Sequence, residues 1–360
     1  MNRRTFKKSA LLSCAIALIL SVTGCNLNGN GNREAEQERT NPTPQSTNES
    51  TPKPLNVANK NQTGSTQTAE MMQDFYAAFS KGDVEGASKF LTPDFIMHVP
   101  GRGKNAGEYW GVEGFQKFYK NILNYNGGKF SMQVPVLSIN KDVVFTREAV
   151  QINRKHDPNN LFNLRFFMEY RIKNGKVSEA WTIPEDLYLY DAYWTPSSKA
   201  PNQARIKKPQ GGAQGISDRV VNNASSKTNR DLVLNFYNTF WQGDLEGLKK
   251  YFAKDFIFYV PGKSNLAGSY KGFDGYLQFR DKLMKIAGGR YKLEIDSIAA
   301  SKNDVFVREY IRMNRKWDPV PRVVPPVILH FEIRNGKITR VNDIPVNLYE
   351  YETFFTSPKR

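Results

Sequence analysis

The stretch DFYAAFSKGDVEG (residues 74–86) recurs as NFYNTFWQGDLEG (residues 235–247), an offset of 161 residues. Aromatic residues at helical spacing precede a Gly-Asp pair in both, which predicts an amphipathic helix, a stop at Gly82 and a second short helix after Asp83. The same offset relates further segments, which are DFIMHVPG (94–101) with DFIFYVPG (255–262), NRKHDP (153–158) with NRKWDP (314–319), and LYLY (187–190) with LYEY (348–351). A constant offset without a gap indicates a tandem duplication.

The duplication divides the chain into five segments. We predict a leader at residues 1–25 and two copies of one domain at residues 69–196 and 230–357. Residues 26–68 are rich in Asn, Gln, Ser, Thr, Gly and Pro, and residues 197–229 are similar but basic. Neither segment can bury enough apolar surface to offset the entropy of folding. We therefore expect a disordered tether and a basic flexible linker.

Each copy combines helices with a run of strands. In the first copy a strand is expected at residues 95–99, stopped by Pro100-Gly101, and a helix at residues 113–125, ended by Gly127-Gly128. The strands that follow are predicted at residues 130–139, 143–153, 164–172 and 177–183, with a hairpin turn KNGK at 173–176. Helices followed by an antiparallel meander predict an α+β fold in which the sheet curls over the helices.

These motifs resemble the SnoaL-like branch of the nuclear transport factor 2-like superfamily, which includes the ketosteroid isomerases. The resemblance implies two tandem cone-shaped barrels, each a curved antiparallel sheet wrapped on N-terminal helices. Superfamily members include cyclases, isomerases, dehydratases and binding domains, so the fold alone does not decide the function. The segments that carry the resemblance are GD (82–83), HVPG (98–101), AGEYWG (106–111), GG (127–128), NGK (174–176) and Trp181 near Pro184, with VPG (260–262) and LAGSYKG (266–272) in the second copy.

The first 25 residues have the three zones of an export signal. Basic residues precede an apolar run at residues 11–20, which is too short to span a bilayer. The VTGC sequence that closes it resembles a bacterial lipobox, which implies lipidation of Cys25. We expect a lipid-anchored protein of the cell envelope, in the outer membrane or periplasm of a Gram-negative host. The alternative is an ordinary secretory signal with an incidental cysteine.

Charge and cysteine usage exclude several function classes. The net charge of +16 lies in the leader, the linker, the C-terminal tail and the second copy, and no nucleic-acid-binding motif accompanies it. The two cysteines, Cys14 and Cys25, precede both copies, so no thiol nucleophile or disulfide is expected there. The three histidines lack ligand spacing, and we predict no metal site, no cofactor and no nucleic-acid partner.

The catalytic positions that the resemblance implies are vacant. Steroid isomerases of the superfamily use an Asp just before the Pro of the first strand as the base, where this chain has Val99 and Val260. A Tyr seven residues before the Gly-Asp donates a hydrogen bond to the oxyanion, and Phe75 and Phe236 stand there. Isomerisation by that pair of residues is therefore not expected.

A glutamate on an apolar strand face is the first catalytic candidate. Along residues 143–153, alternation places Glu148 among apolar residues, and Glu309 repeats this in the second copy. A carboxyl in such surroundings has a raised pKa and can serve as a general base or acid. The alternative is a structural ion pair with an arginine such as Arg147 or Arg308.

His98 is the second candidate, because a histidine carries protons near neutral pH. Tyr259 takes its place in the second copy. Alternation places Glu169 and His330 on a polar face suited to contact between the domains. The residues expected to line a ligand pocket are Tyr109, Trp110, Trp181, Asp186, Tyr259, Tyr270, Glu309 and Asp343.

Three hypotheses follow for the function. The first is a lipoprotein whose two domains bind small apolar or amphipathic molecules and pack together as an intramolecular pseudo-dimer. The second is a SnoaL-like cyclase, isomerase or hydrolase that acts on a polyketide- or steroid-like carbonyl compound, with Glu148 or His98 as its base. The third is a structural module that binds a protein partner and has filled cones.

Overall fold

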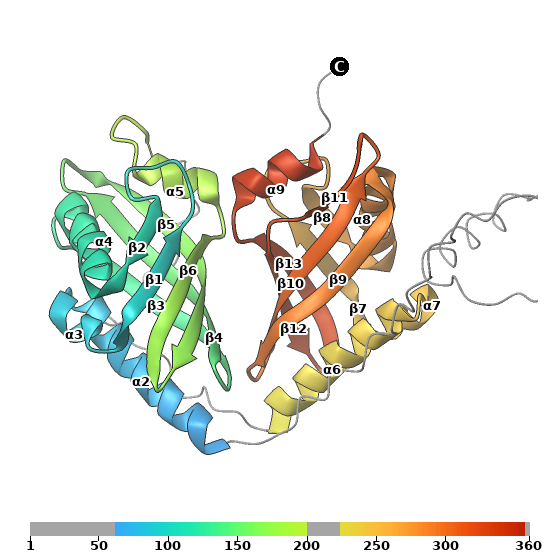
Figure 1. The fold of residues 1–360 in the computed structure, drawn as a ribbon, viewed down its shortest axis with the longest axis horizontal. Coiled ribbons are helices and arrows are strands. Elements are labelled where there is room, and N and C mark those ends of the chain that lie inside the picture. The colour runs from blue at the N-terminus through green and yellow to red at the C-terminus, as the bar shows by residue number, and fades with distance from the viewer. Residues whose placement is uncertain (1–61, 200–223, 357–360) are drawn as a thin grey trace, which may run out of the picture. The chain divides into compact units, whose positions relative to one another are not determined.

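The computed structural model describes residues 62–199 and 224–356 (Figure 1). The predicted leader and most of the predicted tether and linker lie outside these residues. No described helix is both long and apolar enough to cross a membrane. The elements of the first copy are α2 (Gln62–Ser80), α3 (Val84–Ser88), β1 (Leu91–Val99), β2 (Gly107–Trp110), α4 (Gly111–Asn126), β3 (Phe130–Asn140), β4 (Val143–Arg154), β5 (Asp157–Lys173), β6 (Lys176–Pro184) and α5 (Leu187–Tyr193).

The second copy repeats this order of elements, which confirms the duplication and the α+β class. The sheet of the second copy has one additional break, because proline residues separate β11 from β12. Its elements are α6 (Ala224–Trp241), α7 (Leu245–Leu248), the 3₁₀ helix η1 (Lys249–Tyr251), β7 (Phe252–Val260), β8 (Gly268–Lys271), α8 (Gly272–Ile286), β9 (Ala287–Ala300), β10 (Asp304–Arg315), β11 (Asp318–Val323), β12 (Val327–Arg334), β13 (Lys337–Pro345) and α9 (Leu348–Phe355).

The first helix of each copy begins earlier than the sequence predicted. Helix α2 starts at Gln62, inside the predicted tether, and α6 starts at Ala224, inside the predicted linker. The added turns are polar in sequence but packed in the structure. Thr68 is buried, and Asn229 donates a hydrogen bond from Nδ2 to the carbonyl of Lys302 at 2.7 Å. Tertiary contacts therefore extend both helices past the residues in which apolar side chains recur at helical spacing.

The helix ends and the hairpin turn lie at the residues that the sequence predicted. Gly82 has a φ of 79°, and the carboxylate of Asp83 then caps α3 by accepting from the Gly86 amide at 2.8 Å. Gly127 ends α4 in the left-handed conformation with a φ of 72°. Asn174 and Gly175 both have positive φ, as a tight hairpin turn between β5 and β6 requires.

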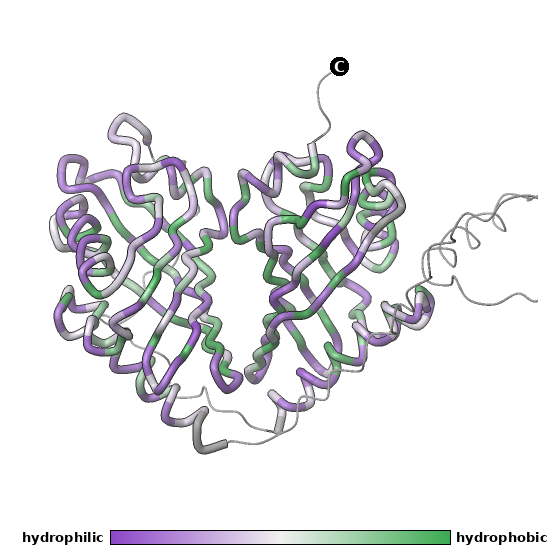
Figure 2. The backbone as a smooth tube through the Cα atoms, viewed as in Figure 1, coloured by the Kyte–Doolittle hydropathy of each residue, from purple (hydrophilic) through white to green (hydrophobic). Residues whose placement is uncertain are grey.

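The sheet of each copy is mixed, where the sequence predicted an antiparallel one. In the first copy the strand order is β2-β1-β6-β5-β4-β3, and β1 runs parallel to β6. The second copy has the same parallel pair, β7 with β13. A parallel pair requires a long crossover, which no local turn signal in the sequence marks. Hydrophobic and hydrophilic residues alternate along the strands (Figure 2).

Each copy has an apolar core of its own, and a third apolar cluster joins the two copies, which fall in one compact unit. This third cluster includes Phe145, Phe167, Phe306 and Ile328. Its contacts link residues that are equivalent under the repeat. The rings of Phe145 and Phe306 stack with centroids 5.3 Å apart, and Ile139 of β3 pairs with Ala300 of β9. The rings of Tyr188 and Tyr349 meet edge to face with centroids 5.4 Å apart. Each copy thus contributes matching residues to the contact.

Candidate functional site

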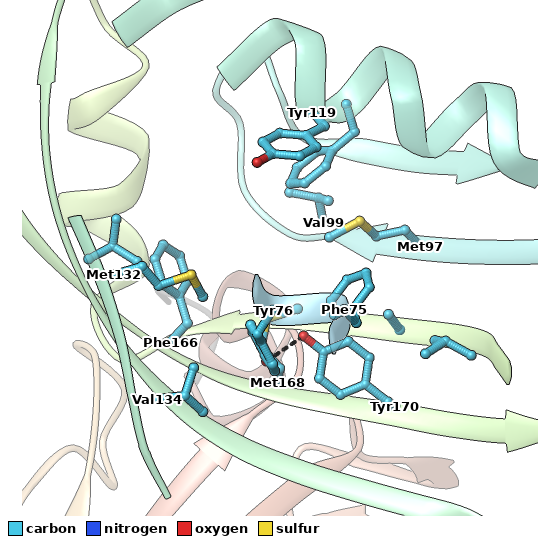
Figure 3. Packing of buried hydrophobic residues seen from close by; sticks show 14 of the residues in the cluster. Phe75, Tyr76, Met97, Val99, Tyr119, Met132, Val134, Phe166, Met168 and Tyr170 are labelled. Atoms are coloured by element: carbon cyan, nitrogen blue, oxygen red, sulfur yellow. Dashed lines mark hydrogen bonds between the residues drawn. The ribbon is translucent and has the colours of Figure 1, made fainter. Parts of the chain in front are cut away.

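A cavity of about 90 Å³ lies inside the cone of the first copy. Its wall is made of aromatic, methionine and aliphatic side chains from α2, β1, α4, α5 and the strands β3 to β6. Figure 3 shows part of this apolar packing, with Phe75 close to the pair Tyr76 and Tyr170. The acidic residue in the lining is Glu148.

Glu148 reaches the cavity because it lies on the inward face of β4. Its side chain is buried, and Oε1 accepts a hydrogen bond from the Tyr76 hydroxyl and a longer one, of 3.4 Å, from the Tyr170 hydroxyl. The two phenols also contact each other at 2.7 Å, and Thr146 lies 2.9 Å from the Tyr76 oxygen. Every hydrogen bond that Glu148 itself accepts from these side chains is at Oε1. Among the described residues, the second oxygen, Oε2, has no hydrogen-bond partner.

The surroundings of Glu148 place the pKa of its carboxyl near neutral pH. Burial raises the pKa of Glu148 to about 7, while the hydrogen bonds from Tyr76 and Tyr170 act in the opposite direction. Burial and the nearby Glu148 charge also raise the pKa of both phenols well above their ordinary value, so they remain protonated. Near neutral pH, Glu148 can therefore accept or donate a proton at Oε2, while the phenols fix the position of Oε1.

The ion-pair alternative for Glu148 is wrong. Arg147 points to the other face of β4 and pairs with Glu185 at 2.8 Å. Arg308 pairs with Glu169 of the first copy, and Glu169 is fully buried. Neither arginine forms an ion pair with Glu148 in the described part of the chain. The predicted polar face of β5 thus carries a charge pair between the copies.

His98 does not line the cavity, which corrects its assignment as a candidate base. On β1 the residues before and after it, Met97 and Val99, are buried in the core, so strand alternation turns His98 outward. Its Nε2 lies 2.9 Å from Glu179 and its Nδ1 lies 3.2 Å from Glu108. The ring is therefore held by two carboxylates on the outer face of the sheet.

Trp181 is also outside the cavity, because it alternates with Ala180 and Thr182, which both line it. The indole stacks on His98 with ring centroids 4.9 Å apart, and the Arg308 guanidinium lies 4.6 Å from the centre of the indole ring. Trp181 therefore belongs to the contact between the copies.

The other wall residues predicted in the first copy have structural positions. Trp110 is 62% exposed at the start of α4, and Asp186 caps α5 by accepting from the Leu189 amide at 2.9 Å. Tyr109 is buried behind the cavity wall, against Phe118. Its hydroxyl donates to Asn105. None of the three is among the residues that line the cavity.

The second copy keeps the buried glutamate and its tyrosine donor, whereas other residues of the site differ. Glu309 is buried and accepts from Tyr237, as Glu148 does from Tyr76, and burial raises its pKa to about 8. Asp343 is buried and accepts from Tyr351 at 2.9 Å. Tyr270 donates to the Leu266 carbonyl at 2.8 Å, which is a structural role.

Tyr259 of the second copy has the outward position of His98. The Arg340 guanidinium lies 5.8 Å from its ring, and Tyr259 pairs with Asn342 in the sheet. Its assignment to a pocket wall is therefore wrong, for the same reason of strand alternation.

In the described part of the chain, no group of three or more His, Cys, Asp or Glu residues could hold a metal ion.

Tyr76 and Tyr170 are the site residues that sequence reasoning missed. Tyr170 shares the inward face of β5 with Leu164, Phe166 and Met168, so alternation alone could have placed it in the cavity. Tyr76 follows the vacant position at Phe75 directly, and no local signal marks its contact with Glu148, which is 72 residues away.

The family model of the SnoaL-like domain matches residues 72–180 and 233–341, which together make up more than half of the chain. The chain belongs to the SnoaL-like domain family. Among curated proteins, uncharacterized proteins of Mycobacterium tuberculosis and Mycobacterium bovis are 25% identical over 126 residues. Those matches cover 35% of this chain and 94% of each relative, so one SnoaL-like domain corresponds to one whole relative.

Solved structures of single domains also match the SnoaL-like copies. Bal32a, from a soil-derived mobile gene cassette, is 24% identical with a TM-score of 0.34, and the match covers 36% of this chain and 98% of that one. A putative polyketide cyclase of Xanthomonas campestris is 16% identical with a TM-score of 0.31, over 36% of this chain and 98% of its own.

Proposed function

We propose that the first SnoaL-like domain binds a small, mainly apolar molecule in its cavity and holds it by a hydrogen bond to Glu148. The observation that carries this proposal is the free oxygen Oε2 in a mainly apolar cavity. The two phenols occupy Oε1 and leave Oε2 for a ligand. A pocket of this kind, apolar with one placed polar group, is typical of small-molecule sites.

The size of the cavity limits the ligand. An apolar protein cavity of about 150 Å³ holds a benzene molecule, whereas this one measures about 90 Å³. The cavity as it stands therefore holds a ligand smaller than benzene, and a single ring such as phenol fits when wall side chains shift outward. A polycyclic ligand of the steroid or polyketide kind would require a larger movement of the wall. Met97, Met132 and Met168 are the side chains best suited to move, since the methionine side chain adapts its shape readily.

Phenol and toluene provide a matched pair of probes for this proposal, because they differ in a hydroxyl group that can bond to Glu148. With the full-length protein, calorimetric titration should show tighter binding of phenol than of toluene. Glu148→Gln should change that preference, whereas Glu309→Gln, the equivalent change in the second domain, should leave it unchanged. If phenol and toluene bind the wild-type protein equally, Glu148 does not anchor the ligand.

A second candidate function is acid–base catalysis on a small carbonyl compound in the same cavity. It is favoured by a carboxyl with a pKa of about 7 beside two protonated phenols, since a general base works best near the ambient pH. Native mass spectrometry of the protein from its own host would distinguish the two functions. A single retained molecule favours binding, and a substrate–product pair that depends on Glu148 favours catalysis.

We further propose that the two domains act as a pseudo-dimer held in the cell envelope by a lipidated Cys25. The contacts between equivalent residues, such as Phe145 with Phe306, support the first part. The basic and apolar leader that ends in VTGC supports the second. Cys25→Ser should release the protein from the membrane fraction, and retention of this variant would contradict lipidation as the anchor.

A further inference from the structure

A tyrosine of helix α5 shares the cavity wall with Glu148. Tyr190 is 4% exposed and is one of the residues that line the cavity. Its ring meets the ring of Phe166 edge to face, with centroids 5.7 Å apart. Phe166 of β5 in turn pairs with Glu148 of β4 in the sheet. Tyr190 and Glu148 are therefore both neighbours of one phenylalanine and belong to one continuous part of the wall.

The hydroxyl of Tyr190 has no acceptor, whereas the other tyrosines of the wall have one. Tyr76 and Tyr170 donate to Glu148. Tyr193 donates to a backbone carbonyl at 3.5 Å. Within residues 62–199 and 224–356, no group accepts a hydrogen bond from Tyr190, and its oxygen is not one of the fully enclosed polar atoms. The Tyr190 hydroxyl therefore has a proton that a ligand in the cavity could accept.

The second SnoaL-like domain shows which acceptor Tyr190 lacks. Under the repeat, Tyr190 corresponds to Tyr351. Thr182, which lines the cavity, corresponds to Asp343. Tyr351 donates to Asp343 at 2.9 Å, whereas the Thr182 hydroxyl has no hydrogen-bond partner in the described part of the chain. With Thr in place of Asp, the tyrosine of the first domain is left without an acceptor.

The groups around the Tyr190 oxygen are donors. Burial raises the pKa of Tyr190, whereas the N–H groups of Trp194 and Asn105 lower it by facing its oxygen. The rings of Trp194 and Tyr190 have centroids 6.3 Å apart. Both N–H groups are buried and make no well-formed hydrogen bond within the described residues. Since buried donors without an acceptor are unfavourable, a ligand that brings an acceptor to this end of the cavity would be favoured.

We propose that the ligand of the first domain carries a carbonyl oxygen, which accepts a hydrogen bond from the Tyr190 hydroxyl. This inference rests on the proposed function, because it concerns the same cavity and adds a second polar contact to the one at Glu148. A carbonyl oxygen has lone pairs and no proton, so it matches a donor that lacks an acceptor. The ligand class is then a small hydroxy aldehyde or hydroxy ketone, whose hydroxyl bonds to Glu148 and whose carbonyl bonds to Tyr190.

Benzaldehyde and toluene are suitable probes, because they share a ring, are close in size to phenol and differ in the carbonyl oxygen. Calorimetric titration of the full-length protein at about pH 8.5 keeps Glu148 mainly ionised, since its pKa is about 7, so that it does not donate to the aldehyde. Tyr190→Phe should weaken benzaldehyde binding roughly threefold to tenfold, as expected for one neutral hydrogen bond, and leave toluene binding unchanged.

Infrared spectroscopy gives a second measurement of the same contact. A hydrogen bond to a carbonyl oxygen weakens the C=O bond and lowers its stretching frequency. The C=O band of bound benzaldehyde should therefore move to higher frequency in Tyr190→Phe. Tyr351→Phe is the matched control, because it removes the equivalent hydroxyl in the second domain, and it should change neither affinity and leave the band in place.

The outcomes separate this inference from the proposed function. If neither phenol nor toluene binds the wild-type protein, the proposed function fails, and the role of Tyr190 fails with it. If toluene binds, and Tyr190→Phe changes neither the benzaldehyde affinity nor the C=O band, the role of Tyr190 alone is overturned. Equal weakening of benzaldehyde and toluene would assign Tyr190 to the shape of the wall and would also overturn it.

Discussion

Replacing Glu148 by Gln should change how the stability of the protein depends on pH. The Glu148 carboxyl has a pKa of about 7 in the folded protein, against 4.5 for the ordinary side chain. A group whose pKa is raised by folding contributes stability that is fully present below the unfolded pKa. That stability is lost as the pH rises through the folded pKa. Glu148 therefore favours the folded protein at acidic pH and disfavours it at neutral pH.

The magnitude follows from the difference between the two pKa values. Each pH unit between them costs the folded state about 1.4 kcal/mol, so about 3 kcal/mol is lost between pH 4 and pH 7.5. Gln does not titrate in this range and keeps the acceptor for Tyr76. The stability of Glu148→Gln relative to the wild type should therefore rise by about 3 kcal/mol over this interval, whatever its constant offset.

Urea denaturation of both proteins at half-unit steps from pH 4 to pH 9 would measure this difference. All other titrating groups cancel between the two proteins, provided that they are distant from Glu148. Glu309→Gln is the matched control in the second domain. Because the pKa of Glu309 is about 8, its difference should continue to grow beyond pH 7.5 and approach about 5 kcal/mol. If the stability difference between Glu148→Gln and the wild type does not vary with pH, the buried position of the carboxyl is refuted.

Two other predictions concern the cavity and the contact between the domains. Ala180 lines the cavity, so Ala180→Leu should fill the cavity and abolish phenol binding in calorimetry. His98→Ala changes the outer face of the sheet and should preserve phenol binding. Loss of phenol binding in His98→Ala would contradict the outward position of His98. Arg308→Met removes one of the two arginines paired with the buried Glu169 and leaves Arg171, which lies 2.8 Å from its Oε1. The variant should therefore cost less in urea denaturation than the about 3–5 kcal/mol expected for a buried charge without any partner, and Glu169→Met in the same chain should restore much of the lost stability. A double variant no more stable than Arg308→Met would show that the loss has another cause.

Much of the site could be predicted from local pattern, and the errors at His98 and Trp181 have one physical origin. Alternation along β4 placed Glu148 on an apolar face, and the cavity confirms that position. His98 and Trp181 were assigned to the pocket from residue type, although the same alternation turns both outward. Residue type indicates the chemistry of a side chain, whereas its position along the strand decides on which face of the sheet the side chain lies.

The sequence by itself determined the duplication, the α+β class, the helix stops at Gly82 and Gly127, and the inward face that carries Glu148. Each of these depends on residues a few positions apart, whose preferences act locally. Tertiary structure alone decided the parallel pairing of β1 with β6, the meeting of Tyr76 with Glu148, and the pairing of Glu169 with Arg308 across the repeat. Those contacts join residues 70 or more positions apart, and the packing of whole elements, which no local pattern encodes, brings them together.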